Sequence, residues 1–229
     1  MPEVQKLLND DGSASVATAV LMSHHAFRRD IALFAHALAK VRLGDASRAE
    51  ALHESWQFYR NALHGHHEAE DTKLFPHLLS EQPQLKDAVA RLTAEHRQID
   101  PLIEQGDAAF ADLKARCADA SRVVGELSTL LDTHLAYEEA EAIKFLRDAT
   151  EFPPAQSEEE ERMIVDGFAW SSHGVAPEVL AQVDAMLPEA LRVQLPAARA
   201  AYKTRCERAW GTSESGASRT CVPDWLSER

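Results

Sequence analysis

Apolar residues recur every three or four positions over four long stretches of the chain, which is the period of an amphipathic α-helix. We expect the four helices at about residues 15–43, 45–80, 84–117 and 121–150. Because the connections between them are short, neighbouring helices should run antiparallel. The pattern therefore predicts an all-α fold, an up-down-up-down four-helix bundle with an additional C-terminal helical layer.

Prolines interrupt the pattern at two places inside the bundle. Pro76 falls near the end of the second stretch, where we expect a kink or a stop. Pro101 lies inside the third stretch and should bend its axis. Residues 1–12 precede the first long helix and are expected to form a short helix of their own.

The pattern changes after Glu151. The sequence Ser157–Glu160 is a capping box and predicts the start of another helix. Further helices should begin near Pro177 and Pro188, the second with a kink at Pro196, and a Ser/Gly-rich, mobile tail should begin at Gly211. We therefore divide the chain into an N-terminal extension (1–13), the bundle (14–150), a C-terminal helical extension (151–211) and a tail (212–229). The C-terminal helices are expected to pack on the bundle and are a candidate interface for a homodimer.

Charge and cysteine usage narrow the function classes. A net charge of −13 over 229 residues argues against nucleic acid and anionic membrane surfaces as partners. Three widely spaced cysteines, none in a CxxC pair, argue against a disulfide framework and a thiolate zinc site. The start of the chain lacks a signal-peptide pattern, and no apolar run reaches the roughly 20 residues of a membrane span. We therefore expect a cytoplasmic protein.

Histidines inside the apolar stripes are the main candidates for chemistry. Each predicted bundle helix carries one: His24, His66, His96 and His134. In the second and fourth helices a glutamate, Glu70 or Glu138, follows the histidine one turn later. Six such groups in an apolar interior would cost free energy unless something neutralises them, as a pair of cations does. We therefore predict that these six side chains bind a metal pair.

The register of the second helix has an alternative. His67 and Asp71 have the same four-residue spacing as His66 and Glu70, but they lie about 100° further round the helix. The alignment of His66 and Glu70 with Tyr59, two turns earlier, favours that pair. His64, His67, Glu68 and Asp71 are then expected to face solvent or to surround the ligands, where one of them would hold an imidazole in position.

Other polar residues near the predicted site are candidates for several roles. Glu139 competes with Glu138, and helical geometry favours Glu138 because it follows His134 by four residues. Asp100, one turn after His96, is a candidate additional ligand. Tyr59 and Tyr137 are candidates for a hydrogen bond to bound peroxide or for a ligand role.

The ligand types indicate which metal is bound. Imidazole and carboxylate without thiolate suit iron, manganese or zinc, and open coordination positions favour non-haem iron. We therefore predict two iron ions with an oxo or hydroxo bridge. Such a pair would keep one or two positions open for dioxygen, peroxide or water, which points to small-molecule chemistry.

The segments SHHAFRRD, HHEAEDTKLFP, AEHRQID and THLAYEEAEAIKF resemble the hemerythrin-like (HHE cation-binding) family over about residues 14–150. The resemblance implies the hemerythrin bundle, with the six residues above as iron ligands. Oxygen-carrying hemerythrins have a fifth histidine in an HxxxH pair on the third helix, where this chain has Asp100. Their last carboxylate follows its histidine by five residues rather than four. These differences point to the redox-active bacterial relatives instead of reversible oxygen carriers.

Three functions remain as expectations. The first is a di-iron protein that binds and reacts with dioxygen or hydrogen peroxide, as a catalase-like oxidoreductase. The second is a non-enzymatic sensor or store of oxygen, nitric oxide or iron. The third is a di-iron oxidase or oxygenase that acts on an organic substrate.

Overall fold

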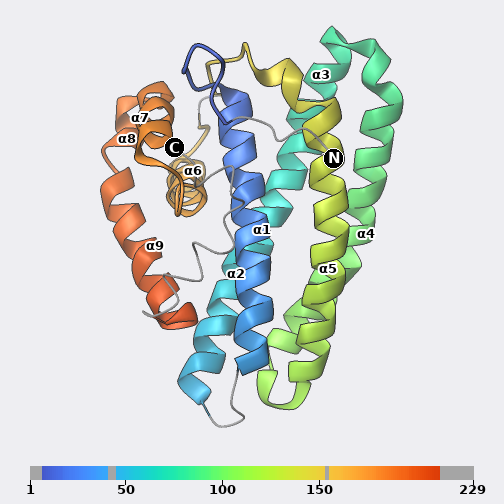
Figure 1. Ribbon diagram of the computed structural model, residues 1–229, viewed down its shortest axis with the longest axis vertical. Helices are drawn as coiled ribbons and strands as arrows, with labels where there is room; N and C mark the ends of the chain where they lie inside the picture. Colours follow the sequence, from blue (N-terminus) through green and yellow to red (C-terminus); the bar gives the residue numbers. More distant parts are fainter. Residues whose placement is uncertain (1–6, 41–44, 153–154, 212–229) are drawn as a thin grey trace. The chain divides into compact units, whose positions relative to one another are not determined.

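The computed structural model describes residues 7–40, 45–152 and 155–211, and every regular element within these ranges is helical, so the predicted all-α fold is confirmed. Four of the helices are long: α1 (Val16–Lys40), α2 (Ala46–Ala69), α4 (Lys86–Phe110) and α5 (Leu113–Glu141) (Figure 1). Shorter elements connect or follow them: η1 (Glu70–Leu74), α3 (Phe75–Glu81), η2 (Pro83–Leu85) and η3 (Ile143–Leu146). The C-terminal helices are α6 (Glu158–Ser171), α7 (Pro177–Met186), α8 (Glu189–Arg192) and α9 (Leu195–Trp210). In the part of the chain that the structure describes, no helix is both long and apolar enough to span a membrane.

The chain forms two compact units. The bundle unit comprises Asp30–Ala142 together with Arg208–Trp210. The described residues of the other, the C-terminal unit, are 7–29, 143–152, 155–207 and 211. Helices α1 and α9 each contribute residues to both units.

Aromatic side chains fill one end of the bundle unit. The ring of Phe34 on α1 lies 5.7 Å from Trp56, 5.2 Å from Phe110 and 4.9 Å from Trp210. Trp56 stacks on Phe110 with ring centroids 4.5 Å apart and donates its indole N–H to Asp107 over 2.8 Å. Trp56 is fully buried. This cluster packs α1, α2, α4 and the end of α9 around one core.

The second predicted helix is divided by a π-helical turn. It runs as α2 to Ala69, continues as η1, and resumes as α3 at Phe75, whose N–H donates to the carbonyl of Glu70, five residues earlier. Pro76 lies in the first turn of α3. Because proline has no N–H, the α-helical hydrogen bond to the carbonyl four residues earlier is lost there, and the wider turn precedes it. The predicted interruption near Pro76 is thus present as a π-helical turn, slightly upstream of the proline.

The predicted break between the third and fourth helices is wrong in position. Helix α4 ends at Phe110 rather than Cys117, and α5 begins at Leu113, where the carboxylate of Asp112 accepts a hydrogen bond from the Ala115 N–H over 3.3 Å. Leu113 is buried, so this capped start is held in the core. Close to the expected break, Arg116 inside α5 has non-helical backbone angles, φ −120° and ψ 23°.

The fourth helix is shorter than predicted, and the described part of the N-terminal segment is not helical; residues 1–6 of that prediction lie outside the described residues. Helix α5 ends at Glu141 rather than Thr150 and is followed by the 3₁₀ turn η3. Residues 7–12 form turns and bends, not a helix. Within the C-terminal unit, the Arg147 guanidinium donates to the Leu7 carbonyl over 3.1 Å and so holds the N-terminal segment against the chain after η3.

The C-terminal helices begin largely where the sequence predicts. The Ser157 hydroxyl accepts a hydrogen bond from the Glu160 N–H over 3.1 Å, which confirms the predicted cap of α6. Gly174, with φ +84°, lies between α6 and α7. The predicted kink at Pro196 is replaced by a break before it, since α8 ends at Arg192 and Pro196 lies in the first turn of α9. The predicted mobile tail at 212–229 lies outside the described residues.

Candidate metal centre

Four buried side chains of the bundle unit converge around one point. These four, the His67 set, are His67, Glu70, His96 and His134, and each offers a ligand atom within 4.8 Å of the others. Helices α2, α4 and α5 and the turn η1 supply them. The Nε2 atoms of His96 and His134 are 3.2 Å apart, and the ring of His67 stacks on that of His96 at 4.0 Å.

Glu70 also belongs to a second group of the bundle unit. In this His66 set, the ligand atoms of His66, Glu70 and Glu138 lie within 4.8 Å of one another. Glu70 Oε1 is 2.8 Å from His66 Nε2, whereas Glu70 Oε2 is 3.4 Å from His96 Nε2. One carboxylate therefore directs an oxygen to each set, which is the arrangement of a bridging ligand.

The remaining predicted ligands differ in their positions. Glu138 is fully buried and Glu139 half-buried, and the choice of Glu138 as the ligand stays a prediction. His24 is fully buried on the part of α1 that belongs to the C-terminal unit, and its role as a ligand stays a prediction. Asp100 is exposed on α4 and belongs to neither set, so nothing in the structure supports it as a ligand.

The expectation that His67 faces solvent is wrong. The side chain is buried, with 6% of its surface exposed, and it lies inside the His67 set. A signal for this position was present in the sequence. Tyr59, Leu63 and His67 follow one another at four-residue intervals, and all three are buried. The inward face of α2 is thus wide enough to include both His66 and His67.

Carboxylates outside the two sets orient two of the histidines. Asp71 Oδ2 is 3.0 Å from His96 Nδ1, and the Thr93 hydroxyl donates to the other Asp71 oxygen over 2.8 Å. Glu95 Oε2 is 3.0 Å from His134 Nδ1. Because a carboxylate only accepts, Nδ1 carries the proton in each imidazole, and in the neutral form of the ring Nε2 presents a lone pair to the set. Asp71 thus has the imidazole-holding role that was expected of one of the four outer residues of this stretch.

This arrangement fits a bound cation. Two Nε2 lone pairs facing each other at 3.2 Å repel unless a positive charge lies between them. Within the described residues, the buried Nε2 of His67 has no hydrogen-bond partner. A metal ion bonded to these nitrogens satisfies all three, and imidazole with carboxylate is a donor set for iron, manganese or zinc.

Electrostatics favour the metal-binding forms of His67 and Glu70. Burial lowers the pKa of His96, but its hydrogen bonds to Glu70 and Asp71 outweigh burial and raise it. Burial holds the pKa of His67 well below 6.5, so the imidazole is neutral. Burial of Glu70 favours the protonated acid, but without a metal the protonated imidazole of His66 and the hydrogen bonds from His66 and His96 outweigh it and hold the pKa of Glu70 well below 4.5. A metal cation in place of these protons acts in the same direction. Glu70 is therefore a carboxylate.

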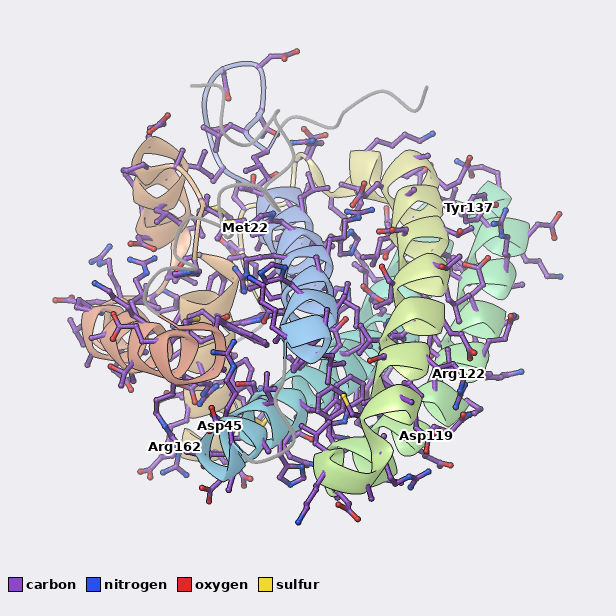
Figure 2. The ribbon with its side chains drawn as sticks, turned by 60° about the horizontal axis from the view of Figure 1, so that its bottom comes forward. Met22, Asp45, Asp119, Arg122, Tyr137 and Arg162 are labelled. Carbon is purple, nitrogen blue, oxygen red and sulfur yellow. The ribbon has the colours of Figure 1, made fainter. Side chains whose placement is uncertain are left out.

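The two predicted tyrosines have different surroundings. Tyr59 is fully buried in the aromatic cluster, 5.7 Å from Phe34, and burial, followed by the charges of Asp30 and Asp132, raises its pKa well above 10. Tyr137 is half-buried on α5 (Figure 2), and the guanidinium of Arg91 lies 3.8 Å from the centre of its ring. The roles of Tyr59 and Tyr137 at the metal site stay predictions.

The family comparison agrees with this geometry. A family model, the hemerythrin HHE cation binding domain, matches residues 16–146, which is more than half of the chain and includes every residue of both sets. No curated protein and no solved structure is significantly similar to the chain. With a bundle of long helices and convergent histidine and glutamate side chains, the chain belongs to the hemerythrin HHE cation-binding family.

Proposed function

We propose that the bundle binds two iron ions, joined by Glu70 and by an oxo or hydroxo bridge, and that this pair reacts with dioxygen or hydrogen peroxide as a catalase-like oxidoreductase. The observation that carries the proposal is the position of Glu70. Its two oxygens face nitrogens of two different histidines, at 2.8 Å and 3.4 Å. A carboxylate so placed is expected to bridge two ions rather than to bind one.

The ligands divide between the two ions. We assign His67, His96 and His134 to one ion and His66 to the other, where the family resemblance adds His24. Glu138 is proposed as a second bridge. With five histidines, two bridging carboxylates and the oxo or hydroxo bridge, two octahedral irons keep a single open position. That position would take one small molecule.

The protein's own part is to admit this molecule and to exclude bulk water. The His66 side chain is 14% exposed, whereas those of Glu70, His96 and His134 are at most 5% exposed. We therefore expect dioxygen or peroxide to enter beside His66. The iron pair would supply two-electron redox chemistry, so that of two peroxide molecules one is oxidised to dioxygen and the other, taking up two protons, is reduced to two waters.

Oxygen evolution tests the proposal. Iron-loaded protein, freed of unbound iron, is mixed with hydrogen peroxide in an oxygen electrode, beside the variants Glu70→Gln and Glu68→Gln. Glu68 is an exposed acid of the same stretch, so its variant should evolve oxygen as the wild type does. Glu70→Gln should lose most of the activity because the bridge is gone. A wild-type protein that holds two irons and evolves no oxygen would overturn the catalase-like reading.

A second candidate, reversible binding of dioxygen or nitric oxide, is favoured by the burial of His67. This residue supplies the fifth histidine whose absence argued against an oxygen carrier. Absorption spectra of the reduced protein, recorded without air, after aeration and after removal of oxygen, separate the two functions. A spectrum that returns unchanged over repeated cycles, without peroxide turnover, supports the binder.

A further inference from the structure

Three charged or polar side chains, each in contact with the next, lead from the surface of α4 to the His67 set. The Arg91 guanidinium donates to Glu95 Oε1 over 2.8 Å, and Glu95 Oε2 is 3.0 Å from His134 Nδ1. Exposure falls along this series of contacts, from 47% for Arg91 to 12% for Glu95 and 0% for His134. An exposed cation is thus two contacts away from a candidate metal ligand.

The corresponding series of contacts that starts from His96 has a different outer partner. There the carboxylate of Asp71 receives a hydrogen bond from the neutral hydroxyl of Thr93, and within the described residues no Lys or Arg donates to it. The carboxylate behind His134 is therefore partly neutralised by Arg91, and the one behind His96 is not. Tyr137 covers the guanidinium of Arg91 at 3.8 Å, which limits the orientations open to that side chain.

We propose that Arg91 and Glu95 are positioning residues that set the metal affinity and the redox potential of the His67 set through His134. Glu95 orients the imidazole and, by accepting its Nδ1–H, makes Nε2 a stronger donor to the metal. Arg91 withdraws part of the negative charge of Glu95 and so moderates this effect. The inference on the potential rests on the proposed iron pair, whereas the inference on affinity requires only that a metal binds.

The two residues should therefore act in opposite directions on the potential. In Glu95→Gln the amide accepts a weaker hydrogen bond, His134 donates less charge, and the oxidised metal is less stabilised, so the potential should rise. In Arg91→Gln the carboxylate of Glu95 keeps its full charge, His134 donates more, and the potential should fall. Arg91→Lys retains a cation and should bring the potential back towards that of the wild type.

The test combines a potentiometric titration of the iron-loaded protein with a zinc competition assay. Arg122→Gln is the matched control, since Arg122 on α5 (Figure 2) forms the same kind of pair with Glu126, four residues on, at 3.0 Å and with both side chains about half exposed. We expect opposite shifts for Arg91→Gln and Glu95→Gln and none for Arg122→Gln. Shifts of the same sign, or shifts no larger than the control's, would overturn the proposal for the potential.

Zinc affinity separates this proposal from the proposed function. Zinc has no redox chemistry and needs only the ligands, so it reports on His134 even if the protein does not use iron. Glu95→Gln should weaken zinc binding by about 10- to 100-fold, the usual cost of losing such an outer partner. Circular dichroism of each variant checks that the helices are intact. An unchanged zinc affinity in a folded Glu95→Gln protein would overturn the positioning role.

Discussion

His66 and His67 are neighbours in the sequence, yet they contribute to different sets of ligand atoms. Each residue of a helix is rotated by about 100° from the one before. His66 Nε2 therefore reaches Glu70 Oε1, while the ring of His67 lies against that of His96. The two histidines can belong to different sets of ligand atoms because both lie on the broad inward face of α2.

Replacing His67 should weaken metal binding. His67→Ala removes a buried nitrogen donor from the His67 set, and we expect zinc affinity to fall by at least about tenfold, as it does when even outer partners are lost. His64→Ala, which removes an exposed histidine of the same stretch, is the control and should bind as the wild type does. Competition with a chromophoric chelator measures both. Equal affinities for the two variants would show that His67 is not a ligand.

The histidine and glutamate pattern identified most residues of the two sets in advance. His66, Glu70, His96, His134 and Glu138 all lie in apolar stripes, because the groups that bind a buried metal must share the face that is buried. The partners Asp71 and Glu95 could not be assigned in the same way. Their contacts join residues 25 and 39 positions apart, and such distances depend on how the helices pack, not on the period within one helix.

At the scale of the helices, element type was predictable and boundaries were less so. The apolar period predicted all four long helices. The end of α4 and the start of α5, however, depend on the cap by Asp112 and on the burial of Leu113. The π-helical turn η1 is a similar case. Pro76 signalled a disturbance, and the wider turn lies just before it, at Glu70–Leu74. Local breaks of this kind depend on packing contacts with neighbouring helices. The apolar period within one helix does not show these contacts.

Helix packing in the aromatic cluster requires a glycine on α4. A Cβ added at Gly106 would lie 2.0 Å from Cζ2 of Trp56, a side chain that is fully buried and stacked on Phe110. Gly106→Ala should therefore destabilise the protein by about 1–3 kcal/mol, even though alanine favours the helix. Gly125→Ala on α5 is the matched control, because a Cβ there meets nothing within 4 Å. It should stabilise the protein by about 0.5–1 kcal/mol.

Urea denaturation at a constant metal load compares the two glycine variants. The midpoint should move down for Gly106→Ala and up for Gly125→Ala, with an unchanged slope. A Gly106→Ala protein as stable as the wild type would mean that Trp56 can move aside at little cost. In that case the close approach of α2 and α4 would not depend on a residue without a side chain at Gly106.

For the whole molecule, metal binding should contribute to stability. The buried carboxylates of Glu70 and Glu138 carry charge into the core, and the metal offsets their desolvation. At a free metal concentration one hundred times the Kd, the added stability is about 2.7 kcal/mol for one site. Thermal unfolding with saturating zinc or ferrous iron should therefore occur at a higher Tm than in excess chelator. Equal Tm values would contradict a metal site in the core.

The C-terminal unit has its own central contact, which should set its stability. Arg29 is fully buried, and its guanidinium donates to the carbonyls of Trp170 and His173 over 3.2 Å and 2.7 Å. It also donates to the Tyr202 hydroxyl over 3.0 Å. A single side chain of α1 thus connects the end of α6, the turn after it and α9. The net contribution of hydrogen bonds to a charged group is about 1.5–3 kcal/mol each.

Arg29→Met should therefore loosen the C-terminal unit by at least about 2 kcal/mol, because it keeps much of the side-chain volume and removes all three hydrogen bonds. The control is Arg162→Met, at an exposed position of α6 (Figure 2). Amide hydrogen exchange measures the effect: amides of α6 and α9 should exchange faster in Arg29→Met, while those of α4 and α5 keep their protection. Faster exchange limited to α6 and α9 would mean that the C-terminal unit opens independently of the bundle unit. Exchange no faster than in the Arg162→Met control would show that the apolar contacts of the unit hold these helices without Arg29.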